Sequence, residues 1–205
     1  MDGREAREVC GAGDARIETA RLTLRAWRED DVEPLALGLN DLDLARWLAF
    51  VPHPYSTADA RSWIVRCRAI AQSAGRPTAY EFAVERKAGR TVIGGVSLNR
   101  IDWEAGTAGG GIWIAGPHQG RGYGREAFAA KIRFAFRDLG LTRLDNGYFD
   151  GNDRSWAMQR GLGFRRAGEV PNRCMADGRQ TIEHRTTLLC SDWTDRDGAT
   201  SGRAS

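Results

Sequence analysis

The chain has 205 residues, and its hydrophobic content of 41% and charged content of 28% are those of a folded domain with a core of its own. The formal net charge of +3 is weak and comes from dispersed arginines balanced by acids, so we expect no nucleic-acid partner. No apolar run is long enough for a membrane span and the N-terminal residues are charged, which argues against a membrane protein and predicts a cytoplasmic location.

The cysteines and histidines carry no recognisable motif. Cys10, Cys67, Cys174 and Cys190 show no C-x-x-C spacing, and the three histidines are scattered along the chain. We therefore expect reduced, unpaired cysteines and no metal cofactor.

The two ends lack the periodicity of secondary structure. Residues 1–15 mix glycine, alanine and charges, and residues 194–205 are similarly irregular. We expect two disordered tails around a single domain at residues 16–193.

Between these ends, apolar residues recur with period two in some segments and about 3.6 in others, which is typical of a mixed α/β domain. Residues 21–27 alternate and predict the first strand. Asp30 or Asp31 is expected to cap a short helix with Pro34 near its start, and a second short helix is expected at residues 42–48.

A stronger helix is predicted to begin after Ser56. Ser56 and Asp59 have the spacing of a capping box. The apolar side chains that share one face of this helix are Ala60, Trp63, Ile64, Cys67 and Ile70. Cys67 is therefore expected in the core.

A hairpin is predicted next. Residues 80–84 alternate, Gly89 marks a turn, and residues 92–98 form the second strand. Gly94 and Gly95 are expected to introduce a bulge in that strand.

A third strand, at residues 111–115 after a polar turn at 102–106, leads into a glycine cluster. The run Gln119-Gly120-Arg121-Gly122-Tyr123-Gly124 opens an amphipathic helix. Glycines let successive backbone N–H groups approach one anion, and the helix N-terminus adds partial positive charge. The run predicts a phosphate or pyrophosphate site, although the same glycines would also suit a tight strand-to-helix turn.

Two common phosphate signatures do not fit this run. The Walker pattern requires Lys and then Ser or Thr after its last glycine, whereas Gly124 is followed by Arg125. The dinucleotide fingerprint fails because a start at Gly120 or Gly122 would place its third glycine at Arg125 or Ala127.

The rest of the chain continues the alternation of helix and strand. Residues 125–139 have the apolar spacing of a helix that ends at Gly140. The segments expected after it are a strand at 144–149, a short helix capped by Asn152 or Asp153 and ended by Gly163, a strand from Phe164 and a strand at 183–189. This order implies a β-α-β crossover of two parallel strands, with the helix N-terminus at their carboxyl ends, where ligands of open α/β sheets bind.

The pattern Gln119-x-x-Gly122-x-Gly124 is similar to the Q/R-x-x-G-x-G/A signature of the GNAT superfamily of acyl-CoA-dependent N-acyltransferases. Further segments resemble its RimJ/RimL-type members, the ribosomal-protein N-terminal acetyltransferases: Arg21-Leu22-Thr23-Leu24-Arg25, Gly120 to Ala127, Leu139-Gly140-Leu141, Asn152-Asp153-Arg154-Ser155 and Gly161-Leu162-Gly163-Phe164. The resemblance covers roughly residues 17–193. It implies a twisted, mostly antiparallel sheet flanked by helices, with the parallel crossover at an acyl-CoA cleft.

The resemblance also implies which residues bind acetyl-CoA. In this family the strand before the glycine run diverges from the next strand, and the pantetheine arm would pair with the backbone of Trp113, Ile114 and Ala115. Asn152 would hydrogen-bond the same arm, although plain N-capping also fits it. The residues whose backbone N–H groups would hold the pyrophosphate are Gln119, Gly120, Arg121, Gly122, Tyr123, Gly124 and Arg125.

Ser155 is the candidate for protonating the departing CoA thiolate. Many family members use a Tyr one helical turn later, but that position is Gln159 here, which cannot donate a proton in the same way. RimL-like members have a Ser where Ser155 lies. The alternative is that Ser155 only completes the first helical turn.

The general base departs from the family pattern. RimL-like enzymes carry a Glu where this chain has Cys174. The proton would leave through water or through one of four carboxylates between which the sequence does not choose: Glu81, Asp102, Glu104 and Glu183. An α-amine titrates near ~8 and a lysine near ~10.4, so a neutral lysine costs roughly 3 kcal/mol more at neutral pH. An acceptor with a low amine pKa is therefore expected.

The sequence thus predicts an acetyl-CoA-dependent N-acetyltransferase that acts by direct attack on a protein N-terminal α-amine or a small amine of low pKa. Antibiotic, polyamine or amino-acid amines are alternative acceptors. A non-catalytic acyl-CoA sensor and a binding module for another phosphate ligand are alternative functions. Trp47 and Trp103 lie near predicted loops that could line an acceptor cleft, and a homodimer is left open.

Overall fold

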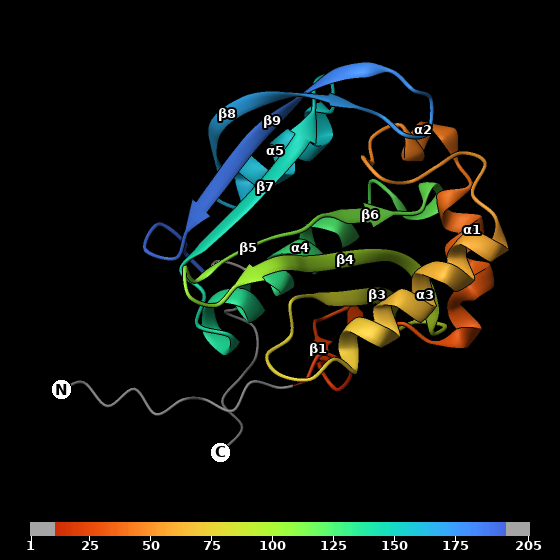
Figure 1. Ribbon diagram of the computed structural model, residues 1–205, viewed down its shortest axis with the longest axis horizontal. Coiled ribbons are helices and arrows are strands. Elements are labelled where there is room, and N and C mark those ends of the chain that lie inside the picture. Colours follow the sequence, from red (N-terminus) through yellow and green to blue (C-terminus); the bar gives the residue numbers. More distant parts are fainter. Residues whose placement is uncertain (1–10, 196–205) are drawn as a thin grey trace.

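Residues 11–195, the part of the chain that the computed structural model describes, form a nine-stranded sheet with helices on both faces (Figure 1). The strands are β1 (Ile17–Glu18), β2 (Leu22–Ala26), β3 (Tyr80–Arg86), β4 (Thr91–Asp102), β5 (Thr107–Gly109), β6 (Ile112–Ile114), β7 (Arg143–Phe149), β8 (Arg165–Arg173) and β9 (Gln180–Leu189). Their spatial order is β1-β2-β3-β4-β5-β7-β9-β8, and β6 pairs with β4 beside this path. The β5–β7 pair is parallel and the other pairs are antiparallel.

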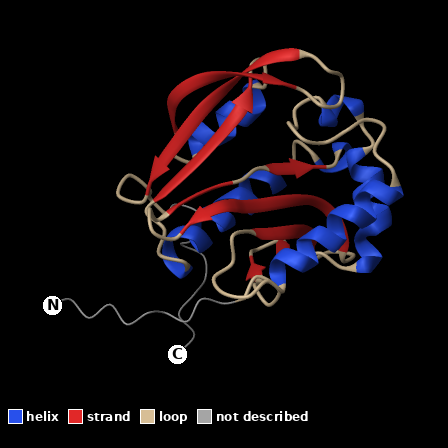
Figure 2. Ribbon diagram, viewed as in Figure 1, coloured by secondary structure: helices blue, strands red, loops and turns tan. Residues whose placement is uncertain are grey.

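The helices lie in two layers, one on each face of the sheet (Figure 2). They are α1 (Val32–Leu39), α2 (Leu42–Ala45), α3 (Thr57–Ala71), α4 (Tyr123–Arg133) and α5 (Asp153–Gly161), with 3-10 turns at Glu29–Asp31 and Gly116–His118 and a π-helical turn at Phe134–Asp138. We call the face covered by α1 and α3 the front face, and the face covered by α4 and α5 the back face.

Two apolar clusters hold the first half of the sheet between these layers. On the back face, Tyr80, Phe82 and Leu98 pack with Phe128 of α4. On the front face, Ala83 packs in a separate cluster, which includes Trp27, Leu35, Leu39, Ile64 and Cys67. Burial of this apolar area on both faces supplies most of the free energy of folding.

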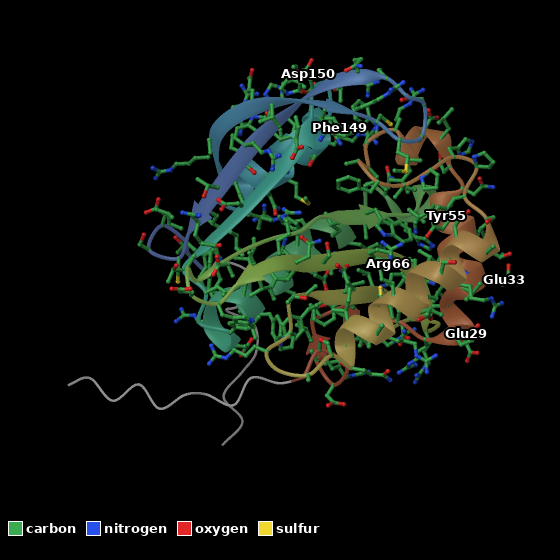
Figure 3. All side chains as sticks on the ribbon, viewed as in Figure 1. Glu29, Glu33, Tyr55, Arg66, Phe149 and Asp150 are labelled. Carbon is green, nitrogen blue, oxygen red and sulfur yellow. The ribbon has the colours of Figure 1, made fainter. Side chains whose placement is uncertain are left out.

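The second half of the sheet, β7, β9 and β8, is covered on the back face only. Tyr148 of β7 stacks on Trp156 of α5, with 5.5 Å between ring centroids. In the described part of the chain no helix packs on the front of β7 and β9, and β8 is exposed along nearly its whole length. Figure 3 shows the same division: Tyr55 and Arg66 lie in the front helical layer, whereas Phe149 and Asp150 lie at the far end of β7.

Local signals predicted the first half well. The Ser56 Oγ accepts from Asp59 N at 3.2 Å and the Asp59 carboxylate accepts from Ser56 N at 2.8 Å, which confirms the capping box. Cys67 is buried, as predicted, and the hairpin of β3 and β4 is confirmed. The register shift in that hairpin makes Ile93, just before Gly94, the extra residue.

Two short helices differ from expectation. The helix predicted at 42–48 ends at Ala45, because the next amides bond three residues back, Trp47 to Leu44 and Leu48 to Ala45. Asp31 is the N-cap residue of α1, one of the two positions predicted, but its side chain makes no capping bond to that helix. The carboxylate instead accepts from Arg28 N at 2.7 Å and pairs with the buried Arg25.

The pairing of strands in the crossover differs from the prediction. The strand predicted at 111–115 is β6, but its partner is β4, and the parallel partner of β7 is β5, which the sequence did not reveal. Gly110 and Gly111 separate β5 from β6, and the two short strands pair on β4 with different segments, so β5 is a strand that the sequence analysis did not predict.

The helix predicted at 125–139 begins at Tyr123, two residues earlier, and changes character after Arg133. In the π-helical turn that follows, Leu139 N donates to Phe134 O at 3.0 Å. Phe134 and Phe136 are both buried in this wider turn. Phe134 packs against Tyr80 and Phe82, and Phe136 packs against Trp193.

Most of the two expected tails lies outside the described residues, namely residues 1–10, which include Cys10, and residues 196–205. Ala12 and Ala15 are buried in the back-face cluster. The Arg133 guanidinium donates to the Asp195 carboxylate at 2.9 and 3.0 Å. The packed structure therefore also includes residues before 16 and after 193, the boundaries expected from the sequence.

Candidate active site

The strands β6 and β7 diverge, and each turns backbone groups toward the space between them. Ser97 N donates to Gly111 O and Ala115 N donates to Ile93 O, both at 2.9 Å, so alternate residues of β6 bond β4. By the alternation of an antiparallel pair, Ile112 and Ile114 face the other way, toward β7. Of Trp113, Ile114 and Ala115, Ile114 is therefore the residue whose backbone lies on the open edge.

The open edge of β7 is centred on Gly147. Asp150 N donates to Ile182 O at 2.8 Å and Cys190 N donates to Thr142 O at 2.9 Å, so the even-numbered residues of β7 bond β9. Gly147 thus turns its backbone groups toward β6. Its carbonyl accepts from Gln159 Nε2 at 3.3 Å.

The glycine run lies at the N-terminus of α4, beside the end of β6. Gly120 and Gly122 have φ values of 71° and 81°, in the left-handed region that favours glycine. The first helical bond runs from Glu126 N to Gly122 O at 3.0 Å, which leaves the amides of Tyr123 and Gly124 without an acceptor inside the helix. The geometry is that of the predicted anion cradle.

Arg21, just before β2, contacts the glycine run and the start of α4, a role that sequence reasoning missed. Its Nη1 donates to the Arg121 carbonyl at 2.9 Å, and its Nε pairs with Glu126 at 2.6 Å. The guanidinium also lies 4.6 Å from the centroid of the Tyr123 ring. The only signal in the sequence was the position of Arg21 in a segment that resembles the family.

Positive charge gathers around the cradle. The pKa of His118 is lowered by burial and by the nearby charges of Arg86 and Arg121. The Arg125 guanidinium extends toward Gly161 at the C-terminus of α5, where the helix dipole favours cations. These charges suit an anionic ligand.

The first turn of α5 brings two predicted residues together. Asn152 caps the helix, with its Oδ1 accepting from Ser155 N at 3.1 Å, so the expected capping role is present. The Ser155 Oγ accepts from Gln159 Nε2 at 3.1 Å, which leaves the hydroxyl hydrogen of Ser155 to donate elsewhere. Gln159, which the sequence marked only as a lost tyrosine, thus orients Ser155.

Gln159 is itself fixed in place. It is 2% exposed, and its Oε1 accepts from Thr186 Oγ1 at 2.6 Å while its Nε2 bonds Ser155 and Gly147. A buried amide with its groups satisfied holds one orientation. Ser155 is therefore held at the open edge of β7.

The candidate bases differ widely in position. Asp102 accepts from Glu104 N and Ala105 N in the turn at the far end of β4. Cys174 is fully buried in the turn between β8 and β9, where its carbonyl accepts from Gly178 N at 2.9 Å. Neither Asp102 nor Glu104 lies at the open edge of β7.

Glu81 has the most perturbed carboxyl group of the four. Burial raises its pKa to about 7, against the opposing effects of Asn99, Lys131 and Arg66. It lines a small front-face cavity beside Cys67 of α3, and the whole of β4 separates it from the divergence of β6 and β7. Glu183, by contrast, lies on the front face over Gly147.

The two tryptophans singled out for an acceptor cleft lie at opposite ends of the sheet. A Cβ on Gly151 would lie 3.6 Å from the Trp47 ring, and Arg179 of the β8–β9 hairpin lies 5.7 Å from that ring's centroid. Trp103 donates to Pro77 O at 2.9 Å beside the turn after β4. Only Trp47 adjoins the turn that leads to Asn152.

Residues 11–195 contain no group of three or more His, Cys, Asp or Glu side chains that could hold a metal ion. Within the same residues no helix is long and apolar enough to cross a membrane.

The glycine run at the start of α4 lies beside two diverging strands, with the Ser155 hydroxyl near their open edge. Residues 21–165 match the family described as acetyltransferase (GNAT) domain. The chain belongs to this family and is an acyltransferase enzyme. Solved structures similar to it include a putative ribosomal-protein-serine acetyltransferase, which is consistent with the RimJ/RimL-type resemblance.

Relatives and solved structures agree with this assignment. The uncharacterized N-acetyltransferase p20 of Bacillus licheniformis is 27% identical over 173 residues, which cover 84% of this chain and 95% of the relative. A putative ribosomal-protein-serine acetyltransferase from Vibrio cholerae has a TM-score of 0.71 at 29% identity and covers 86% of this chain and 98% of its own. Spermidine N-acetyltransferase from Vibrio cholerae, solved with CoA and spermine, shares the fold, with a TM-score of 0.72, 23% identity and coverage of 85% and 98%.

Proposed function

We propose that the protein transfers the acetyl group of acetyl-CoA to a primary amine by direct attack in a ternary complex. The observation that carries this proposal is the meeting of three features at one place: the cradle at the N-terminus of α4, the open edges of β6 and β7, and the fixed hydroxyl of Ser155.

In this proposal the donor runs from the cradle into the space between β6 and β7. The amides at the start of α4 hold the pyrophosphate, with Arg21, Arg86 and Arg121 adding positive charge around it. The amide-like pantetheine arm pairs with the Ile114 backbone and with the side-chain nitrogen of Asn152. The Gln119 side chain, which now donates to Ile114 O at 2.8 Å, must release that carbonyl if the arm uses it.

Ser155 is proposed to hydrogen-bond the departing thiolate and to protonate it. Its oxygen already accepts from Gln159, so its hydrogen is free to turn toward the sulfur. Asn152 would then have two roles, capping α5 through its oxygen and binding the donor through its nitrogen.

The proposed acceptor is a protein N-terminal α-amine or a small amine of low pKa. The roughly 3 kcal/mol cost of deprotonating a lysine relative to an α-amine at neutral pH favours this class. The similar Vibrio cholerae protein, by its description a ribosomal-protein-serine acetyltransferase, supports it as well.

An amine panel tests the proposal. Lysine-free peptides that begin with serine or alanine, matched N-acetylated peptides with one lysine, spermidine and amino-acid amides would each be incubated with acetyl-CoA. CoA release and mass spectrometry of the products would be followed from pH 7 to pH 9. We expect the free α-amines to react at least 10-fold faster than the lysine peptides, as their lower pKa dictates.

Two results would count against this function. Faster lysine acetylation across the whole pH range would overturn the proposed acceptor. Tight binding of acetyl-CoA in calorimetry without turnover of any amine would favour the acyl-CoA sensor instead.

A further inference from the structure

Acetyl transfer to an amine requires a group that removes a proton from the ammonium form of the acceptor. Cys174, which occupies the position of the glutamate in RimL-like enzymes, is fully buried in a hairpin turn. We propose that Glu183 of β9 is the general base of this reaction, held by Asn172 in the space that Gly147 leaves open. This inference rests on the proposed function.

The Glu183 side chain lies on the front face of the second half of the sheet. Glu183 pairs with Phe149 across β7 and β9, and side chains of paired residues share a face. Its side chain is 17% exposed, and Figure 1 shows no helix of the described residues over this part of the front face. A carboxylate there is sheltered from bulk water, yet an incoming amine can reach it.

The acceptor must approach from this same face. On the back face, α4 and α5 cover the divergence of β6 and β7 and carry the cradle, Asn152 and Ser155 (Figure 1). A thioester bound at the open edge of β7 therefore has the donor and its helices behind it. The front is the side left for the amine.

Gly147 places Glu183 and Ser155 at the same point of β7. On the front, a Cβ at position 147 would overlap the Glu183 carboxylate and lie 3.0 Å from its Cγ and Cδ. On the back, the Gly147 carbonyl accepts from Gln159, which orients Ser155. The proposed base, Glu183, and the proposed acid, Ser155, thus lie on opposite faces of the sheet at Gly147, with the open edge of β7 between them.

Neighbouring side chains orient the Glu183 carboxylate without neutralising it fully. Asn172 Nδ2, on β8, donates to Glu183 Oε2 at 2.7 Å. Arg185 Nε, two residues along β9, lies 3.5 Å from Oε1. The amide hydrogen bond fixes one oxygen and leaves the other toward Gly147 and the open edge.

Other carboxylates of this half are committed elsewhere. Glu169 and Asp150 both lie 2.9 Å from the His184 ring, which stacks on Tyr148 on the back face. Asp145 lies on the front face but pairs with Arg143 at 3.0 Å and accepts from Thr187 at 2.9 Å. Glu183 alone among these combines the front face with a carboxylate that lies against Gly147.

The proton balance follows. An ammonium acceptor loses two protons when it becomes an amide. Glu183 takes the first, and the neutral nitrogen attacks the acetyl carbon to form the C–N bond. As the C–S bond breaks, the second proton passes to the sulfur through the Ser155 hydroxyl, and Glu183 returns its proton to water. The products are the N-acetylated amine, CoA thiol and one released proton.

The test is the variant Glu183→Gln, assayed with the fastest acceptor of the amine panel. We expect kcat/KM to fall about 100-fold at pH 7, in the range usual for a lost general base. The deficit should shrink to less than about 10-fold at pH 9, where a larger share of the amine is already neutral. The dissociation constant of acetyl-CoA in calorimetry should be unchanged.

The matched control is Glu169→Gln, which removes a carboxylate from the same hairpin on the opposite face. Its kcat/KM and pH profile should stay within about 2-fold of wild type, since the lost partner is His184. Circular dichroism of both variants reports whether they fold.

A second pair of variants keeps the inference testable if Glu183→Gln folds poorly. Gly147→Ala displaces the Glu183 side chain without removing its charge, and we expect a similar loss of kcat/KM. Asn172→Ala removes a positioning residue, and we expect a smaller loss, about 10-fold, with an altered pH profile and unchanged acetyl-CoA binding.

The outcomes separate this inference from the proposed function. Wild-type kcat/KM and pH profile in Glu183→Gln would overturn the base assignment while acetyl transfer stood. An equal loss at all pH values would also overturn it, because a base becomes dispensable as the amine deprotonates. Absence of turnover in the wild-type protein would instead overturn the proposed function, and the base with it.

Discussion

The two halves of the sheet are stabilised in different ways. In the first half, β3 is buried along almost its whole length and both faces are covered by apolar clusters. In the second half, β8 is almost entirely exposed, and the front of β9 and β8 carries polar side chains such as Glu183, Arg185 and Asn172. The first half supplies stability and the anion cradle, and the second supplies a polar surface beside the open edge.

This difference is clearest in the ion pairs. Arg25 of the first half lies between Asp31 and Glu85, with side chains only 6–8% exposed. Arg143 of the second half pairs with Asp145, with side chains 47% and 48% exposed. An arginine–carboxylate ion pair is thus buried in the core of the first half and exposed on the surface of the second.

The largest effect should come from breaking that buried pair. Arg25→Met leaves two carboxylates buried without their cation, so we expect the free energy of unfolding to fall by 3–5 kcal/mol, about the usual cost of breaking a buried pair. The matched variant Arg143→Met should cost less than about 1 kcal/mol. Urea denaturation followed by circular dichroism measures both, and equal losses would contradict the comparison.

The next effect concerns the cradle. Gly122→Val forces a β-branched residue to a φ of 81° beside Arg21, so we expect the dissociation constant of acetyl-CoA to rise about 100-fold. Gly124→Ala is the control, because its Cβ would meet Ile114 and Met158 at 3.6 and 3.9 Å, ordinary contact distances. Calorimetry measures both. Near wild-type affinity in the valine variant would remove the cradle from donor binding.

Ser155→Ala should act on turnover and not on binding. Loss of a general acid lowers kcat by about 100-fold, and we expect the KM for acetyl-CoA to stay within about 3-fold. Ser73→Ala, just after α3 and away from the site, is the control; there Ser73 Oγ donates to Ile70 O at 2.7 Å. An unchanged kcat in Ser155→Ala would leave that serine with its helical role alone.

The smallest effect belongs to a buried lysine of the first half. Lys131 of α4 is fully buried, 3.4 Å from Gly110 O and 3.9 Å from the Phe128 ring centroid, and burial lowers its pKa to about 7. Its nearby charges act in opposite directions, Glu81 raising the pKa and Arg100 lowering it. Above pH 7 the unfolded chain keeps a proton on this lysine that the folded chain has lost.

Stability should therefore rise with pH between 7 and 9, by at most about 1.4 kcal/mol per pH unit. Lys131→Met should remove this slope, whereas replacing the only other lysine, the exposed Lys87, should not. Thermal or urea unfolding at pH 7, 8 and 9 measures it. A wild-type free energy of unfolding that is flat or falls over this range would contradict the prediction.

The sequence predicted what local interactions decide. The Ser56 capping box, the glycine run at the start of α4 and the Asn152 cap each depend on residues a few positions apart, and each is present in the structure. The strand β5 was missed because three residues before a glycine run carry too little pattern, and its partner β7 lies far along the chain.

The sequence could not choose among the four candidate bases for the same physical reason. Glu183, Asn172 and Gly147 lie on three strands, and only the register of the sheet brings them together. From the sequence, Glu183 was one of four equivalent carboxylates. The sequence indicated only that Gln159 cannot donate a proton as a tyrosine would. Its hydrogen bonds to Ser155, Gly147 and Thr186 depend on how α5 packs on β7, which local sequence does not reveal.

The overlap between position 147 and the Glu183 carboxylate reaches beyond this one chain. A Cβ at position 147 would occupy the volume that the carboxylate now fills, so a larger residue there requires the Glu183 side chain to move away from the open edge. Among related sequences, a glutamate at the position of Glu183 should occur with glycine at that of Gly147. The glycine and the glutamate together would then mark the related chains that keep the proposed base at this position.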